Sequence, residues 1–406
     1  MTSKLRLPGL DWPLALATLG LITMGLLTVY SATSIPGAHQ GLWMRQLAWC
    51  VLAFGAAWLV SAIHYRLYDS LSWPLYGVSL VMLVAVLVVG TSKMGAKRWI
   101  DLGPLQFQPS EIAKIATTFV LARYFDHARI NLDKVRWWLP PLFIAMVPFV
   151  LVAKEPDLGT GLSFPVMLVA MYFWAGMPPG KLLLGLSPVF NVALFFVTGT
   201  VWWFVGLFVA LLAFARPKLS LLLVMLALNG VVAFELPHLW NHLHDYQKRR
   251  IETFINPDND PMGAGYQIIQ SKIAIGSGGV TGKGYLKGSQ KALAFLPMRH
   301  TDFIYSVVGE ELGFLGAFIV VLLYGVVIVR GYRLAAVALD GFAGLMAIGV
   351  VTALFFTILV NMLMTVGWAP VTGVPLPFLS YGGTALVVNC VQIGLLQNVA
   401  LRRREM

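Results

Sequence analysis

Residues 74–90 read PLYGVSLVMLVAVLVVG and contain no charged side chain. A run of this length and composition suits a helix that crosses a bilayer, because a span needs roughly 17 to 25 mostly apolar residues. The chain therefore predicts an all-α polytopic membrane protein with about twelve transmembrane helices. The other predicted spans are residues 14–32, 44–63, 111–125, 138–153, 160–176, 182–198, 200–215, 218–237, 303–329, 341–366 and 378–399.

The composition supports the same class. Of the 406 residues, 58% belong to the AVILMFWYC set and only 12% are Asp, Glu, Lys or Arg, which is about half the charged share usual in soluble domains. This excludes a set of soluble domains, and the high hydrophobicity excludes a disordered chain. Cys50 and Cys390 lie in apolar stretches, so neither a disulfide framework nor a thiolate metal cluster is expected. We expect one integral membrane unit, residues 1–406, in a bacterial inner membrane or a similar bilayer.

The distribution of the positive charge predicts the orientation. The net charge is +11. With the N-terminus inside, the short cytoplasmic loops and the termini carry 15 Lys and Arg residues, against 5 in the opposite short loops. Short cytoplasmic loops are enriched in these residues, so the chain is predicted to have both termini in the cytoplasm. The long loop 238–302, with eight further cations, then lies outside.

Loops this long in compact proteins tend to be functional, so we expect loop 238–302 to be ordered. Tyr266, Ile269 and Ile273 follow a helical spacing, with Gln267 and Ser271 off that face. The spacing predicts a short amphipathic helix that lies on the membrane surface.

Charged residues in or beside the predicted spans are candidates for function, because ionisable groups are costly in a membrane. Glu111 and Lys114 are three residues apart on one helix face and can pair, either as a packing contact or in a cavity for a charged head group. Lys97 and Arg98 beside Trp99 suit a phosphate or a sugar ring. An aromatic anchor with snorkelling cations explains the same residues, and it is the better interpretation from the residues alone.

A second charged cluster, Lys154-Glu155-Pro156-Asp157, lies at an outer helix junction. Pro156 should break the helix there and expose backbone groups that need a cavity or a partner. A binding role and a purely structural role are equally compatible with this cluster.

The outer loop holds Asp258 and Asp260 between prolines and glycines. Such a fixed backbone suits a catalytic acid or base. Ordinary Asx-Pro turns explain a single Asp better, and two carboxylates are weak support for a cation site.

The following run Gly276–Gly284 resembles a phosphate-binding loop, but Ser277 and Gly284 occupy positions that break the motif. It predicts a flexible set of N–H donors, with Lys283, for a pyrophosphate. A zinc site at His238, His242 and His244 is disfavoured, because no clear carboxylate or cysteine completes it. A penicillin-sensitive Ser-x-x-Lys nucleophile is absent from the sequence, which argues against peptide cross-linking by this chain.

Several motifs in order make the chain similar to the SEDS family of bacterial cell-wall glycosyltransferases over almost its whole length. The loop residues Gly282–Gln290 and the pair Arg299-His300 resemble the RodA, or elongation, branch. The matching motifs are Gly95–Trp99, Phe107–Glu111, Asp260–Gln267, Arg299–Ile304, Gly309–Gly313 and Pro375–Thr384.

The resemblance implies polymerisation of lipid II, with Asp260 as the catalytic base of an inverting single displacement. It also implies a growing lipid-linked glycan strand and a class B penicillin-binding protein as partners, and no nucleic acid. Mg²⁺ or Mn²⁺ is a candidate cofactor that the sequence leaves open. The candidate substrate-binding residues are Lys97, Arg98, Trp99, Glu111, Lys114, Lys154, Asp157, Lys283, Arg299 and Ser380.

The family is expected to have ten spans, so a helical hairpin within 182–215 is predicted as an insertion. The inner membrane is the expected location, with the active site on the outer face. The alternative function is a lipid II flippase, which would place its polar groups near the midplane with access to both faces.

Overall fold

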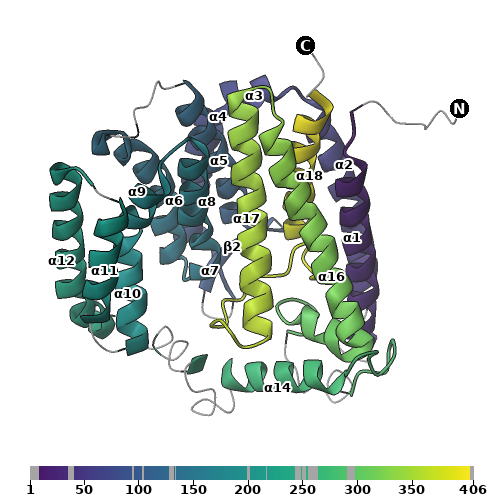
Figure 1. Cartoon of the computed structure of the whole chain (residues 1–406). Helices are drawn as coiled ribbons and strands as arrows, with labels where there is room; N and C mark the ends of the chain where they lie inside the picture. Colours follow the sequence, from purple (N-terminus) through teal and green to yellow (C-terminus); the bar gives the residue numbers. More distant parts are fainter. Residues whose placement is uncertain are drawn as a thin grey trace, which may run out of the picture.

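The computed structural model is a bundle of helices (Figure 1). It describes residues 9–34, 41–93, 96–102, 105–127, 132, 134–198, 202–215, 217–242, 248, 253–254, 264–289 and 298–402. Each predicted span corresponds to a helix, or to two short helices, in these ranges. Seven of the described helices are long and apolar enough to cross a membrane by themselves. The predicted polytopic helical class is confirmed.

The main bundle surrounds two central helices, α17 (Gly341–Thr365) and α18 (Gly383–Arg402). In α17, 72% of the most apolar 18-residue window is buried, and in α18 the share is 78%. The corresponding share is only 22% in α2 and 28% in α4, so those helices form the lipid-facing rim. The helices around the centre are α1 (Trp12–Thr33), α2 (Leu42–Ala62), α4 (Ser72–Val89), α5 (Pro109–His127), α6 (Leu139–Lys154), α8 (Ser163–Trp174) and α16 (Ile304–Ala336).

Local sequence signals explain several helix ends. Asp11 caps α1, because its side chain accepts from the Leu14 N–H at 3.1 Å. Asp340 caps α17 in the same way. Short helices connect or extend the long ones: α3 (Tyr65–Ser70), the 3₁₀ turn η1 (Val135–Trp137), α7 (Leu158–Gly161) and α9 (Pro179–Gly185).

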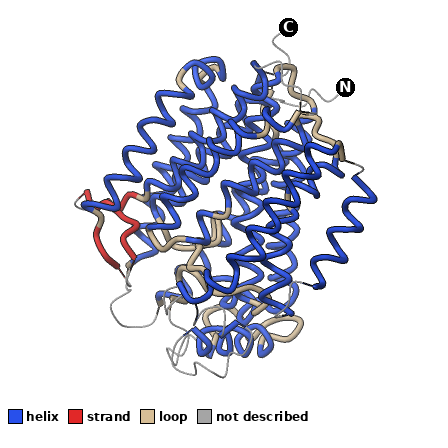
Figure 2. Tube along the Cα trace, turned by 90° about the vertical axis from the view of Figure 1, so that its left-hand side faces the viewer, coloured by secondary structure: helices blue, strands red, loops and turns tan. Residues whose placement is uncertain are grey.

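A small antiparallel sheet, which the all-α prediction did not include, precedes α5. Its strands are β1 (Thr91–Lys93), β2 (Ala96–Leu102) and β3 (Leu105–Phe107), in the order β1-β2-β3. Trp99 of β2 lies opposite Thr91 of β1. The sheet lies at one edge of the bundle (Figure 2). Strands this short carry little hydrophobic periodicity, so the residue pattern did not predict them.

Residues 187–242 form a separate group of three helices beside the main bundle, on the left of Figure 1: α10 (Ser187–Thr198), α11 (Trp202–Ala215) and α12 (Leu219–His242). Leu184, Phe208, Leu211, Leu221 and Met225 give this group and α9 their own apolar core. The Asn229 amide donates to Ser187 Oγ at 2.7 Å and ties α12 to α10. The inserted hairpin within 182–215 stays a prediction.

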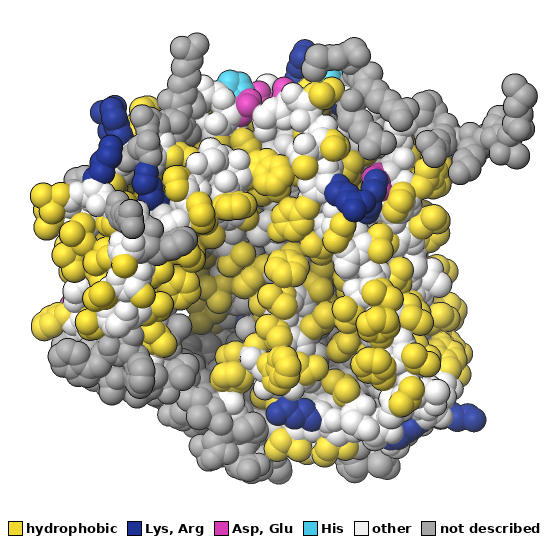
Figure 3. Space-filling view, in the orientation of Figure 1, with side chains coloured by type: hydrophobic (Ala, Val, Ile, Leu, Met, Phe, Trp, Pro, Cys, Tyr) yellow, Lys and Arg dark blue, Asp and Glu magenta, His cyan; other side chains and the backbone are white. Residues whose placement is uncertain are grey.

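The start of α1 and the end of α18 lie at one end of the bundle, and α14 (Ala264–Ser277) lies across the opposite end (Figure 1). This agrees with termini on one side of the membrane and the long loop on the other. In Figure 3, hydrophobic side chains cover the middle of the face, and Lys and Arg lie nearer its two ends.

The helix predicted in the outer loop is α14, and the contact of its Tyr266, Ile269 and Ile273 face with the membrane surface stays a prediction. Ile273 is 45% exposed, whereas Ile268, Ser271 and Ala274 are buried. A polar contact that spacing cannot show fixes the face that packs against the protein. Ser271 Oγ lies 2.6 Å from Ser306 Oγ and donates to the Thr365 carbonyl at 2.5 Å.

Candidate functional site

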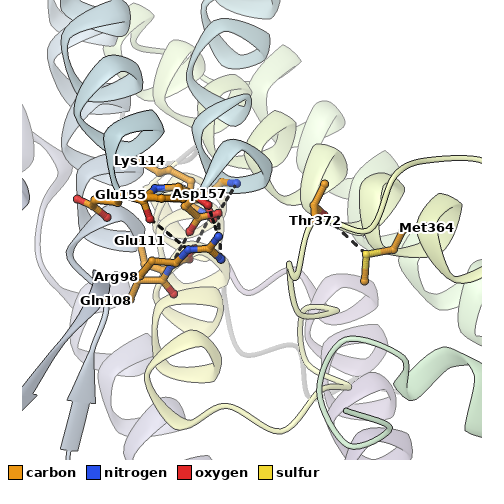
Figure 4. A network of polar contacts seen from close by, with 10 residues as sticks. Arg98, Gln108, Glu111, Lys114, Glu155, Asp157, Met364 and Thr372 are labelled. Atoms are coloured by element: carbon orange, nitrogen blue, oxygen red, sulfur yellow. Dashed lines mark hydrogen bonds and ion pairs between the residues drawn. The ribbon is translucent and has the colours of Figure 1, made fainter. Parts of the chain in front are cut away.

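Four segments bring a polar cluster together beside the outer part of the main bundle (Figure 4). Arg98 comes from β2, Gln108 directly precedes α5, and the junction between α6 and α7 contributes Glu155 and Asp157. Glu111 and Lys114 come from the first turns of α5. The two charged clusters that the sequence presented separately are therefore one network.

The predicted pair on α5 is confirmed. Lys114 Nζ lies 2.8 Å from Glu111 Oε1, and Lys114 is only 3% exposed. The pair offsets two charges that would each be costly alone. It therefore adds polar groups to this region without adding net charge.

Arg98 closes the junction between α6 and α7. Its guanidinium donates to the Glu155 carbonyl at 3.4 Å and to the Pro156 carbonyl, and lies 3.7 Å from Asp157 Oδ1. Asp157 also accepts from Gln108 Nε2 at 3.0 Å and caps α7 through the Thr160 N–H. Pro156 does break the helix, and Arg98 binds the carbonyl groups that the break releases.

Glu155 is a site residue that the sequence analysis did not select. Its side chain is fully buried, and neither carboxylate oxygen has a hydrogen-bond partner among the described residues. Burial, followed by the charge of Asp157, raises the pKa of Glu155 to about 8, although Arg98 acts in the opposite direction. The group is therefore a neutral acid at pH 7. The only sequence signal was its place in the Lys154–Asp157 run.

The loop between α17 and α18 lies against this cluster. A β-carbon placed on Gly373 would lie 3.6 Å from Asp302 Oδ2 and 3.9 Å from Arg98 Nη1. One placed on Gly159 would meet Val374 and Thr372 side chains at 2.4 and 2.8 Å. Asp302 is thus a second carboxylate near Arg98, which the sequence analysis quoted only as part of a motif. Glycine permits the close approach at Gly159, whereas position 373 needs glycine for its positive φ of +72°.

The remaining predicted residues have different surroundings. Trp99 is half-buried on β2, and Lys154 is exposed at the end of α6. Arg299 is half-buried and donates to the Ala32 carbonyl at 3.0 Å. The structure describes neither the side chain of Lys97 nor any part of Asp260. Their predicted roles therefore stay predictions.

Two residues that were predicted to bind substrate already contact other groups of the protein. Lys283 Nζ lies 2.8 Å from the buried Glu310 Oε1, so its charge is paired. Ser380 Oγ donates to the Thr301 carbonyl at 2.6 Å and accepts from the Leu376 N–H at 2.8 Å. Ser380 is 5% exposed and holds a turn. These contacts do not support substrate binding by either residue.

The run Gly276–Gly284 is not a free phosphate-binding loop. The Lys283 and Gly284 N–H groups donate to the carbonyls of Glu310 and Glu311, both at 3.0 Å. Those donors were predicted to bind a pyrophosphate, but helix α16 occupies them. As for a metal, the described part of the chain contains no group of three or more His, Cys, Asp and Glu side chains able to hold one.

Comparison with known proteins gives matches over nearly the whole chain. The family model FtsW, RodA and SpoVE, described as "Cell cycle protein", matches residues 12–198 and 196–405. Peptidoglycan glycosyltransferase MrdB of Escherichia coli is 38% identical over 400 residues, covering 97% of this chain and 94% of MrdB. The probable peptidoglycan glycosyltransferase FtsW of Trichlorobacter lovleyi is 34% identical over 406 residues, with coverage of 97% and 94%.

Solved structures agree with these matches. A chain of a peptidoglycan synthase complex, described as coordinating polymerization and crosslinking, superposes with a TM-score of 0.73 at 31% identity, covering 98% of this chain and 99% of that one. The rod shape determining protein RodA of Thermus thermophilus gives a TM-score of 0.63 at 27% identity, with coverage of 97% and 98%.

Proposed function

Because this chain belongs to the FtsW, RodA and SpoVE family, we propose that it is a peptidoglycan glycosyltransferase of the RodA branch. The observation that carries this proposal is the similarity to MrdB across 97% of the chain. The substrate is lipid II, a disaccharide-peptide on undecaprenyl pyrophosphate, and the product is a glycan strand for cell elongation.

Asp260 is the general base of the proposed reaction. It removes the proton from the C4 hydroxyl of the acceptor sugar, and that oxygen attacks the anomeric carbon of the lipid-linked strand. The bond from this carbon to the pyrophosphate breaks, with inversion from α to β, and the pyrophosphate leaves with the electron pair. A positioned carboxylate base contributes about 10²- to 10⁴-fold to such a step.

The described cluster contains two of the cations that could face such a leaving group, Arg98 and Lys114. Preorganised cations stabilise charge that develops in a transition state. Arg98 is the best-placed cation of the cluster, since it is half-buried and directly contacts the junction that holds Glu155 and Asp157. The neutral Glu155 adds no negative charge beside it at pH 7. Because Asp157 and Glu111 pair with these cations, binding of an anionic head group here stays a proposal that also depends on Lys97.

A divalent cation, Mg²⁺ or Mn²⁺, stays a prediction. The candidate ligands Asp258 and Asp260 lie outside the described residues. The described part of the chain supplies no ligand set for it. No step above depends on a metal ion.

The proposed location is the bacterial inner membrane, with the chemistry on the extracytoplasmic face. Helix α14, which lies opposite the start of α1 and the end of α18 (Figure 1), would lie on that face. The proposed partner is a class B penicillin-binding protein, which would supply the transpeptidase. The similarity to a chain of a peptidoglycan synthase complex supports such an assembly.

Polymerisation of lipid II by the purified protein, with and without the transpeptidase partner, tests the proposal. We expect glycan strands from the wild type and none from Asp260→Ala, with equal amounts of both proteins in the membrane. Asp258→Ala is the matched control and should keep most of the activity. Wild-type activity from Asp260→Ala would refute the assignment of the base. Lipid II movement across vesicles without polymerisation would favour the flippase.

A further inference from the structure

The run Gly276–Gly284 and the motif Gly309–Gly313, which the proposed reaction does not use, interlock in the structure. The loop donates two hydrogen bonds to α16, to the Glu310 and Glu311 carbonyls. Helix α16 in turn donates two hydrogen bonds to the loop. The Phe314 N–H donates to the Gly279 carbonyl at 2.9 Å, and the Leu315 N–H to the Val280 carbonyl at 3.1 Å. The loop thus supplies partners for backbone groups that the kink in α16 releases.

The two backbones approach so closely that side chains are excluded. Gly313, with φ of +65°, forms the kink in α16. A β-carbon on Gly313 would lie 2.2 Å from the Gly282 nitrogen, and one on Gly282 would lie 2.1 Å from the Glu311 oxygen. One on Gly278 would lie 2.0 Å from the Gly309 oxygen. Glycine is therefore required on both sides of the contact.

Two buried carboxylates complete the interlock. Glu310, which is 1% exposed, binds Lys283 Nζ at 2.8 Å and accepts from the Ser289 N–H at 2.7 Å. Glu311, which is 3% exposed, accepts from Ser31 Oγ of α1 at 2.7 Å and from the Gly288 N–H at 3.4 Å. Charge-assisted bonds of this kind are stronger than neutral ones. They hold the segment after α14 against both α16 and α1.

The interlocked segment continues directly from α14. The Gly278 N–H donates to the Ile275 carbonyl at 3.2 Å, so the helix leads into the contact without a flexible link. On its other side, α14 is fixed to α16 and α17 through Ser271. Asp260 precedes the first residue of α14 by four positions in the sequence. The place where α14 lies therefore limits where this aspartate can lie.

We propose that the segment Gly278–Ser289, clasped to Gly309–Leu315, fixes α14 and thereby positions the catalytic aspartate, with Glu310 and Glu311 as positioning residues. This inference rests on the proposed function. Glu310 and Glu311 act through the clasp, and the substrate contacts neither of them. Opening the clasp should therefore lower turnover more than substrate affinity.

Gly282→Ala tests the clasp, and Gly279→Ala is its matched control. Both glycines have positive φ, but a β-carbon on Gly279 has nothing within 4 Å. In Gly282→Ala, kcat for lipid II should fall on the order of 100-fold, because small misplacements of a catalytic group have effects of that size. KM should change by less than about threefold, since the substrate-binding cluster is untouched. Gly279→Ala should stay within about threefold of the wild type in both constants.

Hydrogen exchange of the Lys283, Gly284, Phe314 and Leu315 amides provides a readout that needs no turnover. Exchange should accelerate in Gly282→Ala and stay slow in Gly279→Ala, because these amides bond across the clasp. Faster exchange with wild-type kcat would overturn the positioning role. Unchanged exchange would overturn the clasp itself. If these amides exchange slowly in the wild type but the protein does not polymerise lipid II, the proposed function is refuted and the clasp is still supported.

A second set of variants covers the case in which Gly282→Ala does not fold. Glu310→Gln and Lys283→Met each leave one group of the pair without its partner, whereas the double variant removes both charges. We expect each single variant to lose kcat and the double variant to recover at least about half of it. Equal kcat in the wild type and both single variants would overturn the role of Glu310.

Discussion

Glu155→Gln should stabilise the protein by an amount that grows with pH. The fully buried carboxyl of Glu155 follows the last residue of α6, outside the predicted span, and has no hydrogen-bond partner among the described residues. Glutamine has nearly the same shape and cannot ionise. The substitution therefore changes only the response of this position to pH.

The magnitude follows from the pKa of Glu155, which burial raises from the ordinary 4.5 to about 8. In the folded protein the carboxyl keeps its proton up to about pH 8, whereas the unfolded chain releases it near pH 4.5. The folded state binds more protons in this window, so the free energy of unfolding falls as the pH rises. The loss is about 1.4 kcal/mol for each pH unit, about 4 kcal/mol at pH 8, and it levels off at about 5 kcal/mol above that pH.

The assay is unfolding of the purified proteins in detergent micelles at pH values from 4.5 to 8.5. The stability of Glu155→Gln relative to the wild type should rise from pH 4.5 upward and level off above about pH 8. A difference between Glu155→Gln and the wild type that does not change with pH would refute this reasoning.

Two further predictions concern buried charges. Lys114→Met leaves Glu111 without its partner, so it should lower the free energy of unfolding by about 3 to 5 kcal/mol. The double variant with Glu111→Gln should recover most of the stability but not the polymerase activity. Full recovery of both would show that this pair serves only the packing of the helices. Arg330→Gln removes the contacts of Arg330 with the buried Asp11, at 3.0 and 3.1 Å, and should cost about 2 kcal/mol. Arg333, which is exposed on the same helix, provides the control. The free energy of unfolding of Arg333→Gln should stay within about 0.5 kcal/mol of the wild type. Equal losses in the two variants would contradict the structural role of the Asp11 contact.

The sequence predicted the features that depend on short distances along the chain. The apolar runs predicted the spans, because a helix in lipid must bury its own backbone groups and show apolar side chains outward. Glu111 and Lys114 could be paired because three residues along a helix return to the same face. The break at Pro156 followed from the proline itself.

Predictions that depended on a distant partner were less successful. Spacing placed Ser271 off the apolar face of α14, but it could not show that Ser271 is buried against Ser306 of α16. Lys283 and its glycines looked available for a phosphate until Glu310 and Glu311 occupied them from α16. Neither carboxylate lies within 25 residues of Lys283 in the sequence, so no local pattern could reveal the contact.

The sequence by itself determined the class of this protein, its spans, its charge asymmetry and the family to which it belongs. These properties follow from composition, from helical periodicity and from motifs that are each contiguous in the chain. The tertiary structure alone decided that Arg98, Asp157 and the buried Glu155 share one site. It also decided that the run Gly276–Gly284 forms hydrogen bonds with α16. The physical reason is that burial and pairing of charge are set by residues far apart in the sequence, which meet only when the helices pack.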